Sequence, residues 1–252
     1  SPSALQMLYL RKKKRYCVLE LLLMKTKIIN LSGLKFIIRK DKLDLSLVKE
    51  VIEREVYDRL CINNDDIVLD IGGHIGSFAV FYSAKCKKII SFEPNSENFE
   101  FLKRNIRLNK CKNVKYFKKA VIGNDDSTRA LYLCMTKSTG SHSLYVNKRR
   151  KVTEKVRCVN INKILALYHP NKIKIDCEGG EYELLTSVKN FSGVQKIIFE
   201  YHFSMLRDAN IVKFKRVLNV LKSNFYTVEY PMSIIENNRG SWQPIIFASK
   251  AE

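Results

Sequence analysis

Short apolar runs alternate with segments of helical periodicity along most of this chain, and this alternation constrains the fold more than any other feature. Each run has the length of a buried strand, and each following segment places its apolar residues on one helical face. Repeated β-α units of this kind predict a parallel sheet with helices on both faces. The strand-type runs stand at 67–70, 88–92, 114–122, 172–176 and 195–201, and the helical segments at 77–84, 97–108, 161–168, 181–188 and 205–221.

The C-terminal end departs from this alternation. The runs 225–230 and 244–249 are separated by a polar loop without a helix, so we expect these two strands to pair antiparallel. The whole pattern predicts an α/β fold with a doubly wound, mostly parallel seven-stranded sheet of Rossmann-like type, together with an antiparallel C-terminal strand pair and a small N-terminal hairpin and helix.

The length of 252 residues suffices for one buried core, and we expect residues 25–252 to form a single domain. Residues 25–62 are expected to form the N-terminal hairpin and helix, and residues 63–252 the Rossmann-like core. Between about 125 and 159 the alternation is interrupted by β-type runs around polar turns, which predicts a β-rich insertion, with strands at 130–134, 144–146 and 152–159.

Within the N-terminal part, two short β-type runs flank Ser32-Gly33, which predicts a hairpin turn there. Apolar residues then recur at helical spacing from Leu47 to Leu60, with Ser46 placed near the start as a candidate cap.

Residues 1–24 differ from the rest because the basic run Arg11–Arg15 precedes the apolar stretch Tyr16–Met24, which Glu20 interrupts. That stretch is shorter than the roughly 18–20 continuous apolar residues of a membrane span, and no small-residue cleavage site of a secretory signal follows it. We interpret residues 1–24 as a basic leader or a linker remnant, with a peripheral membrane role as the alternative.

The formal net charge of +20 has two explanations that the sequence leaves open. One is attraction to an anionic partner such as nucleic acid, a membrane surface or a nucleotide-linked substrate. The other is the compositional bias of an AT-rich coding sequence, which the many Ile, Asn, Tyr and Phe residues favour. The seven scattered cysteines, never spaced as CxxC, indicate neither a disulfide framework nor a structural zinc site, and they favour a cytoplasmic location.

A glycine-rich turn follows the first strand of the alternating series, in the segment that reads IVLDIGGHIGS from Ile67 to Ser77. Glycines let the backbone turn tightly and let a ligand lie against it. In open α/β sheets the first βα turn is where nucleotides bind. The candidate cofactor-binding residues of this turn are Asp70, Gly72, Gly73, His74, Gly76 and Ser77.

The second strand ends in Phe92-Glu93-Pro94, and a carboxylate at this point accepts hydrogen bonds from the ribose hydroxyls of an adenosyl group. The dinucleotide fingerprint GxGxxG is absent, because His74 stands where its second glycine would be. Asp70 would repel a pyrophosphate but could hold the ammonium of a methionine. These residues favour S-adenosylmethionine (SAM) over NAD, and an NAD-dependent sugar oxidoreductase is the alternative.

A second constellation lies in IKIDCEGGE, from Ile173 to Glu181, and in IFEYH, which ends in His202. Two strands deliver Asp176 and His202 to their carboxyl ends, and Glu178 follows closely, whereas the helix dipole alone explains Glu181. We interpret Asp176, Glu178 and His202 as the catalytic group, with His202 as general base. Alternatively, the oxygens of Asp176 and Glu178 bind Mg²⁺ or Mn²⁺.

The ordered series VLDIGGHIG, FEP, IKIDCEGGE and IIFEYH resembles the FkbM family of SAM-dependent methyltransferases, and the likeness covers about residues 27–202. The resemblance implies a class I methyltransferase fold and O-methylation, commonly of a sugar or polyketide hydroxyl. It also implies contacts of Asp70, Gly72, Gly76 and Ser77 with methionine, of Glu93 with ribose, of Asn95, Lys119 and Ala120 with adenosine, and of Asp176, Glu178 and His202 with the reacting hydroxyl. His74 departs from the Asn that is usual in the family.

The acceptor is expected to be a sugar or glycan, which could be nucleotide-linked, and Lys137–Arg150 (including Ser141, His142, Ser143 and Tyr145) is a candidate wall for it. An RNA 2′-O-methyltransferase is the main alternative, although no RNA-binding module is recognisable. A non-catalytic binding protein is a further alternative, and the oligomeric state is open.

Overall fold

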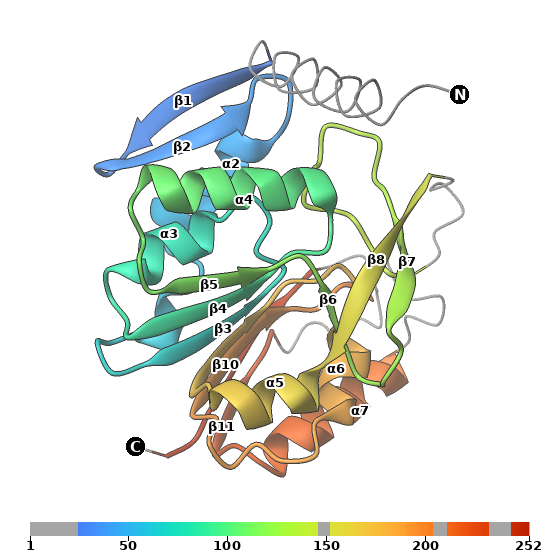
Figure 1. The fold of residues 1–252 in the computed structure, drawn as a ribbon. Coiled ribbons are helices and arrows are strands. Elements are labelled where there is room, and N and C mark those ends of the chain that lie inside the picture. The colour runs from blue at the N-terminus through green and yellow to red at the C-terminus, as the bar shows by residue number, and fades with distance from the viewer. Residues whose placement is uncertain (1–24, 146–151, 204–210, 232–242, 252) are drawn as a thin grey trace.

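The computed structural model describes residues 25–145, 152–203, 211–231 and 243–251, so the predicted leader at 1–24 lies outside the described residues. Its central element is a seven-stranded sheet (Figure 1). All neighbours pair in parallel except β12, which is antiparallel to both strands beside it. In sheet order the strands are β11 (Thr227–Glu229), β12 (Ile245–Ser249), β10 (Lys196–Glu200), β9 (Lys172–Ile175), β3 (Ile67–Ile71), β4 (Lys88–Phe92) and β5 (Val114–Phe117).

Helices cover both faces of the sheet, as the alternating pattern predicted (Figure 1). On one face lie α2 (Asp44–Ile52), α3 (Ser77–Ser83) and α4 (Ser96–Leu108), and on the other α5 (Ile161–Tyr168), α6 (Glu181–Ser187) and α7 (Ile211–Lys222). Each face has its own buried apolar cluster, one joining the sheet to α3 and α4 and the other joining it to α5, α6 and α7. The doubly wound fold with an antiparallel C-terminal strand pair is therefore confirmed.

The N-terminal hairpin consists of β1 (Thr26–Leu31) and β2 (Leu34–Arg39). Its turn residues Ser32 and Gly33 both have positive φ, which suits the tight twist of a two-residue hairpin. The edge of β2 is covered by α4. The side-chain amide of Asn105 accepts the backbone N–H of Ile37 at 2.7 Å and donates to the carbonyl of the same residue. Asn109, one helical turn later, does the same at Lys35. Side-chain amides thus satisfy a strand edge that would otherwise be open.

Two predicted N-terminal features were wrong in detail. The helix ends at Ile52 instead of Leu60, because Glu55 adopts a left-handed backbone and a short 3-10 turn, η1 (Asp58–Leu60), follows. Ser46 is not a cap, since the residue before the helix is Leu43 and no side chain caps this end. The apolar residues beyond Ile52 are still buried, but in a turn, which is why their helical spacing misled the prediction.

The predicted strand 114–122 is two strands in two sheets. β5 belongs to the central sheet, and β6 (Ala120–Ile122) pairs with β8 (Thr153–Asn160), which pairs in turn with β7 (Thr128–Tyr132). These three strands form the β-rich insertion. The predicted strand at 144–146 was wrong in its described part, because residues 144–145 form a bend and only the preceding Ser143 makes an isolated bridge to Tyr132.

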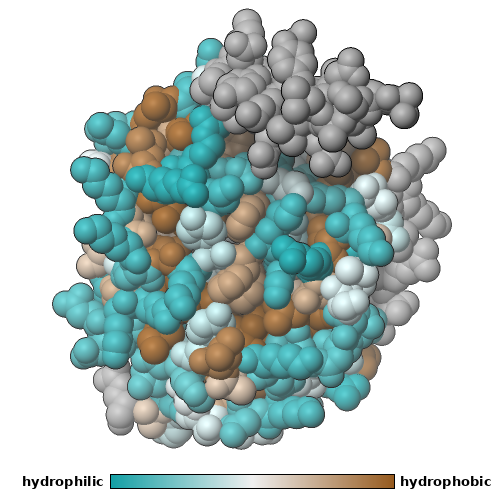
Figure 2. Space-filling model, in the orientation of Figure 1, coloured by the Kyte–Doolittle hydropathy of each residue, from teal (hydrophilic) through white to brown (hydrophobic). Residues whose placement is uncertain are grey.

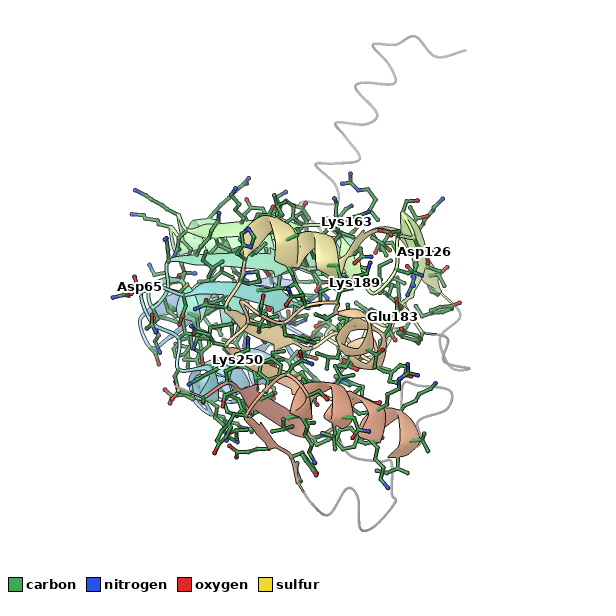
Figure 3. All side chains as sticks on the ribbon, turned by 90° about the horizontal axis from the view of Figure 1, so that it is seen from below. Asp65, Asp126, Lys163, Glu183, Lys189 and Lys250 are labelled. Carbon is green, nitrogen blue, oxygen red and sulfur yellow. The ribbon has the colours of Figure 1, made fainter. Side chains whose placement is uncertain are left out.

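The carboxylate of Glu183 connects the small sheet to the core. Glu183 on α6 accepts both terminal N–H groups of Arg129 at 2.7 and 2.9 Å, the hydroxyl of Tyr145 at 2.6 Å and the backbone N–H of Gly123. Figure 3 shows Glu183 and Asp126 on this side of the molecule. Paired, charge-assisted hydrogen bonds of this kind fix orientation as well as adding stability.

Across the described ranges, no helix combines the length and the apolar character that crossing a membrane would require. Hydrophilic side chains cover much of the face seen in Figure 2, and apolar residues appear between them.

Candidate active site

A cavity of about 290 Å³ lies at the carboxyl ends of β3, β4, β9 and β10. The cavity is at the topological switch point of the sheet: α3, which follows β3, and α6, which follows the neighbouring β9, lie on opposite faces. Most predicted site residues line it, namely Gly72, Gly73, His74, Ser77, Glu93, Lys119, Ala120, Asp176, Glu178 and His202. Asp70, Gly76 and Asn95 are not among the lining residues.

The glycine turn is required by the closeness of two strands. Gly72 has a φ of +83°, and a Cβ built on it would lie 1.7 Å from the carbonyl oxygen of Asp176. Strands β3 and β9 are paired up to Ile71 and Ile175, so the two chains are still in contact where the turn begins. The lack of a side chain at Gly72 therefore lets the glycine turn contact the backbone of Asp176 at the end of β9.

Asp70 is fully buried beneath this turn. Its carboxylate lies 3.1 Å from the ammonium of Lys174 and accepts the hydroxyl of Ser91 at 2.6 Å. Lys174 also donates to the carbonyl of Gly72 at 2.7 Å. Burial lowers the pKa of Lys174, but the carboxylates of Asp70 and Asp176 outweigh this and raise it. The cation that Asp70 holds is thus Lys174, and its expected contact with methionine stays a prediction.

Glu93, at the end of β4, supports the turn from the other side. One oxygen accepts the backbone N–H of His74 at 2.9 Å and the other that of Asn95 at 2.8 Å. Burial raises the pKa of this carboxyl to about 8. Each oxygen can accept a second hydrogen bond, so the group can bind a diol without releasing the backbone.

His74 has a structural role that the sequence did not reveal. Its Nε2 lies 2.9 Å from the hydroxyl of Thr139, and that hydroxyl donates to Asp44 at 2.7 Å. Because the Thr139 proton is used in this way, we assign the proton of the imidazole to Nε2. Burial lowers the pKa of His74 to about 3, so the ring is neutral. The chain of bonds connects the cofactor turn, the insertion and α2.

The residues predicted near adenosine divide into two groups. Lys119 and Ala120 line the cavity, where the apolar side chains of Val121 and Leu131 continue the same wall. Asn95 instead caps α4, because its side chain accepts the backbone N–H of Asn98 at 3.0 Å. Asn95 also holds Glu93 through its own N–H, so its contribution to a ligand is indirect.

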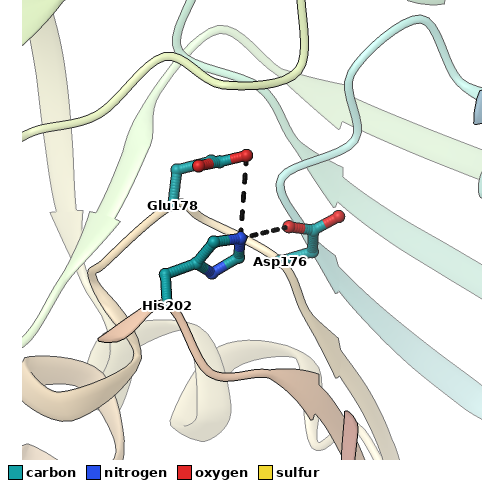
Figure 4. A group of neighbouring side chains, drawn as sticks. All are labelled: Asp176, Glu178 and His202. Carbon is teal, nitrogen blue, oxygen red and sulfur yellow. Dashed lines mark ion pairs between the residues drawn. The ribbon is translucent and has the colours of Figure 1, made fainter. Parts of the chain in front are cut away.

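The catalytic group predicted from sequence converges at one point of the cavity (Figure 4). His202 Nε2 lies 3.6 Å from Glu178 Oε1 and 3.9 Å from Asp176 Oδ1. On its other side, His202 Nδ1 is 3.0 Å from Glu181 Oε1. Glu178 has a φ of +55°, a conformation that costs about 1–2 kcal/mol in a residue with a side chain. Strain of this kind is typical of functional sites.

The carboxylates determine the charge of His202. Burial lowers the pKa of this imidazole, but Glu181, Glu178 and Asp176 outweigh it and raise that pKa to about 10. His202 therefore carries a proton at neutral pH in the ligand-free site. A general base needs the neutral ring, so His202 would have to lose this proton first, and its role as a base assisted by Asp176 and Glu178 stays a prediction.

Sequence reasoning missed three other cavity residues. Glu200, the last residue of β10, lies 4.0 Å from His202 Nε2, and burial together with Asp176 raises its pKa to about 8. Tyr57 donates to Asp176 Oδ2 at 3.4 Å, and Glu50 on α2 lines the same end. Glu200 lies within the recognised motif IIFEYH and was a detectable signal. Tyr57 is brought to Asp176 only by the tertiary fold.

The predicted acceptor wall is present in part. Ser141 and His142 line the cavity together with Ser138, Gly140 and Leu144. Ser143 instead donates to the carbonyl of Glu178 at 2.6 Å, and Tyr145 is bound to Glu183. Residues 146–150 of this segment lie outside the described residues.

Comparison with known proteins identifies the family. The sequence pattern that defines the Methyltransferase FkbM domain matches residues 70–228, which is more than half of the chain. The chain belongs to the FkbM methyltransferase family. Methyltransferase 1 of Beauveria bassiana (strain ARSEF 2860) is 24% identical, over 57% of this chain and 67% of its own length.

The fold of this FkbM methyltransferase is similar to that of solved structures. A protein described as a transferase from Pyrococcus horikoshii is 15% identical, with a TM-score of 0.50, and the likeness covers 90% of this chain and 73% of that one. A methyltransferase FkbM from Methylobacillus flagellatus is 14% identical, with a TM-score of 0.48, over 74% of this chain and 44% of that one.

Proposed function

We propose that this FkbM methyltransferase transfers a methyl group from SAM to a hydroxyl group of a sugar or glycan. The observation that supports the proposal is that one cavity contains both a candidate adenosyl site and an acid–imidazole cluster. The adenosyl side consists of the glycine turn and Glu93, and the acidic side consists of Asp176, Glu178 and His202.

The lining of the cavity suits SAM. Glu93 can accept the two ribose hydroxyls, and Ala120 with Val121 and Leu131 gives an apolar wall for adenine. The sulfonium of SAM is positive, and the carboxylates of Asp176 and Glu178 at the far end favour a positive charge. The methyl group would then point toward the acidic end.

The acidic end also suits a neutral, hydroxyl-rich acceptor. The carboxylates of Glu50, Asp176, Glu178 and Glu200 line it, and carboxylate oxygens accept hydrogen bonds from hydroxyl groups. The same charges disfavour a diphosphate or a phosphodiester next to the reacting atoms. A nucleotide-linked acceptor would have to place its diphosphate away from this end.

Methyl transfer to oxygen is an in-line displacement: the acceptor oxygen forms a bond to the methyl carbon while the carbon–sulfur bond breaks, and S-adenosylhomocysteine leaves. Alignment of the three atoms supplies much of the rate. A carboxylate at the acidic end accepts a hydrogen bond from the acceptor hydroxyl, and it takes up that proton as the oxygen–carbon bond forms. His202, positioned by Glu181, lies beside these carboxylates as an ion-pair partner.

The proposal is tested with SAM that carries a deuterium-labelled methyl group, incubated with panels of glycans, lipids and RNA and read by mass spectrometry. We expect label on a glycan hydroxyl. We expect Asp176→Asn to lower kcat by about 100-fold, within the usual range for removing an acid–base group. The matched control is Asp65→Asn, an exposed acid at the edge of the molecule far from the cavity (Figure 3), which should leave kcat unchanged. Label found only on RNA, or absence of SAM binding, contradicts the proposal.

A further inference from the structure

The cluster Asp176, Glu178 and His202 has the geometry of a metal site. One ligand atom from each residue, two carboxylate oxygens and one imidazole nitrogen, all lie within 4.8 Å of one another. The three residues come from the end of β9, the following turn and the end of β10 (Figure 4). For metal–ligand bonds of about 2.1 Å, ligand atoms at right angles lie about 3.0 Å apart and opposite ones about 4.2 Å apart. The cluster needs only a small contraction to enclose an ion.

The orientation of His202 is the second observation. Glu181 Oε1 lies 3.0 Å from Nδ1, and Glu181 is itself held by the backbone N–H groups of Gly179 and Cys177. This directs Nε2, on a side chain that is 1% exposed, into the space between the two carboxylates. Its distances of 3.6 and 3.9 Å to them exceed a hydrogen bond. A histidine whose second nitrogen is held by a carboxylate is typical of metal ligands.

The ion-pair partners of the cavity carboxylates also favour a bound cation. In the ranges that the structure describes, His202 is the only basic side chain that forms an ion pair with Asp176 or Glu200. Lys174, the next cation along β9, is already paired with Asp70. Asp176 thus has a single basic ion-pair partner among the described residues, and a cation bound beside this carboxylate would be favoured.

We propose that Asp176, Glu178 and His202 bind a divalent transition-metal ion, with Glu181 as the group that orients His202. An imidazole together with two carboxylates fits Mn²⁺ better than Mg²⁺, which prefers oxygen ligands alone. Three protein ligands leave coordination positions open to the acceptor. The proposal rests on the proposed function in one respect: a hydroxyl bound to the ion would lose its proton more readily.

The experiment measures Mn²⁺ binding directly on the purified chain after treatment with EDTA, from the loss of the electron paramagnetic resonance signal of free Mn²⁺, with Zn²⁺ as a competitor. We expect one bound ion per chain. Asp176→Asn and Glu178→Gln should each weaken binding by on the order of 100-fold, and Glu181→Gln by about 10- to 100-fold, as for other groups that orient a ligand. Asp65→Asn is the matched control and should bind Mn²⁺ like the unaltered chain.

Calorimetry with S-adenosylhomocysteine in EDTA accompanies each variant. It shows that the variant is folded, and it separates the two proposals because the glycine turn and Glu93, which are proposed to hold the adenosyl group, are not among the three metal ligands. Cofactor binding without binding of either Mn²⁺ or Zn²⁺ overturns the metal site and leaves the proposed function standing. Metal binding that persists undiminished in Asp176→Asn and Glu178→Gln also overturns the site. Metal binding without cofactor binding overturns the proposed function alone.

Discussion

At Gly72 the glycine turn packs against the backbone of Asp176, just after β9, and leaves no room for a side chain. A Cβ there would lie 1.7 Å from a backbone oxygen, and φ is +83°. We expect Gly72→Ala to lower the melting temperature and to weaken S-adenosylhomocysteine binding by more than 10-fold, because the turn must move away from β9. Differential scanning fluorimetry and calorimetry measure the two effects.

Gly33→Ala is the matched control for Gly72→Ala. Gly33 has a similar φ of +79°, but nothing lies within 4 Å of its Cβ position. The control therefore carries only the cost of the left-handed backbone, about 1–2 kcal/mol, and should leave cofactor affinity unchanged. Equal effects of the two substitutions on cofactor binding would contradict the role assigned to Gly72.

Glu93 predicts a pH dependence of cofactor binding. Its pKa in the free protein is raised to about 8 by burial, and the ionised form is the better acceptor for two ribose hydroxyls. If binding requires the ionised form, a proton is released on binding below pH 8, so the affinity rises with pH and levels off above about 8. We expect S-adenosylhomocysteine to bind about 25-fold more tightly at pH 8.5 than at pH 6.5.

The control for this pH dependence is Glu93→Gln, which keeps the shape of the side chain and removes its titration. Its affinity should be weaker than that of the unaltered chain at high pH and should vary little between pH 6.5 and 8.5. A slope that is the same in both proteins would show that another group causes it.

Sequence alone revealed the residues whose position follows from topology. Asp176 and His202 could be placed together because carboxyl ends of parallel strands meet at one edge of the sheet. The partner of Asp70 was harder to foresee, because Lys174 stands opposite it only once the register of β3 and β9 is known. Thr139 could not be foreseen as the partner of His74, since nothing local connects two residues 65 positions apart.

At the scale of elements, Glu183 joins α6 to the small sheet. The carboxylate and Arg129 are 23% and 20% exposed and form two parallel hydrogen bonds. We expect Glu183→Gln to lower the free energy of unfolding by about 1–3 kcal/mol, the usual contribution of hydrogen bonds to charged groups. The loss should also raise KM for the acceptor, because Tyr145 and the neighbouring lining residues lose their support. Denaturant titration and steady-state kinetics measure these effects.

Asp126→Asn provides the comparison for Glu183→Gln. Asp126 also contacts Arg129, at 3.1 Å, but it lies in the loop before β7 and its side chain is 53% exposed. An exposed pair of this kind adds little stability, so we expect a change below about 1 kcal/mol and an unaltered KM. Equal effects of Glu183→Gln and Asp126→Asn on the free energy of unfolding and on KM would contradict the role of Glu183 in connecting α6 to the small sheet.

The order of strands and helices could be predicted from periodicity, whereas the assignment of strands to sheets could not. Val114–Ile122 was predicted as one strand, but the chain leaves the central sheet after Phe117 and enters the small sheet at Ala120, with Lys118-Lys119 between the two strands. The spacing of apolar residues indicates which side chains are buried, but it does not indicate which strand a given strand pairs with. For the same reason the spacing from Leu47 to Leu60 continued beyond the true end of α2.

At the scale of the whole molecule, a chain with a net charge of +20 contains a cavity whose reactive end is acidic. Of the described lysines and arginines, Lys119 and Lys174 line the cavity, and Lys174 is paired with Asp70. The surface in the view of Figure 2 is largely hydrophilic. An acceptor that enters the cavity meets carboxylates, while a polyanion would be attracted to the surface and repelled at the reacting atoms. The charge of the whole chain and the charge of the site thus favour different partners.

This contrast predicts how turnover responds to salt. For a neutral glycan acceptor we expect kcat/KM to change by less than about 2-fold between 50 and 200 mM NaCl, because no ionic contact is lost. An RNA acceptor held by 6–10 phosphate contacts would lose about 10³- to 10⁵-fold in affinity over the same range. Kinetics at fixed saturating SAM isolate the acceptor from salt effects on the cofactor. A steep loss of kcat/KM with salt would show that the basic surface, and with it a nucleic acid, takes part in acceptor binding.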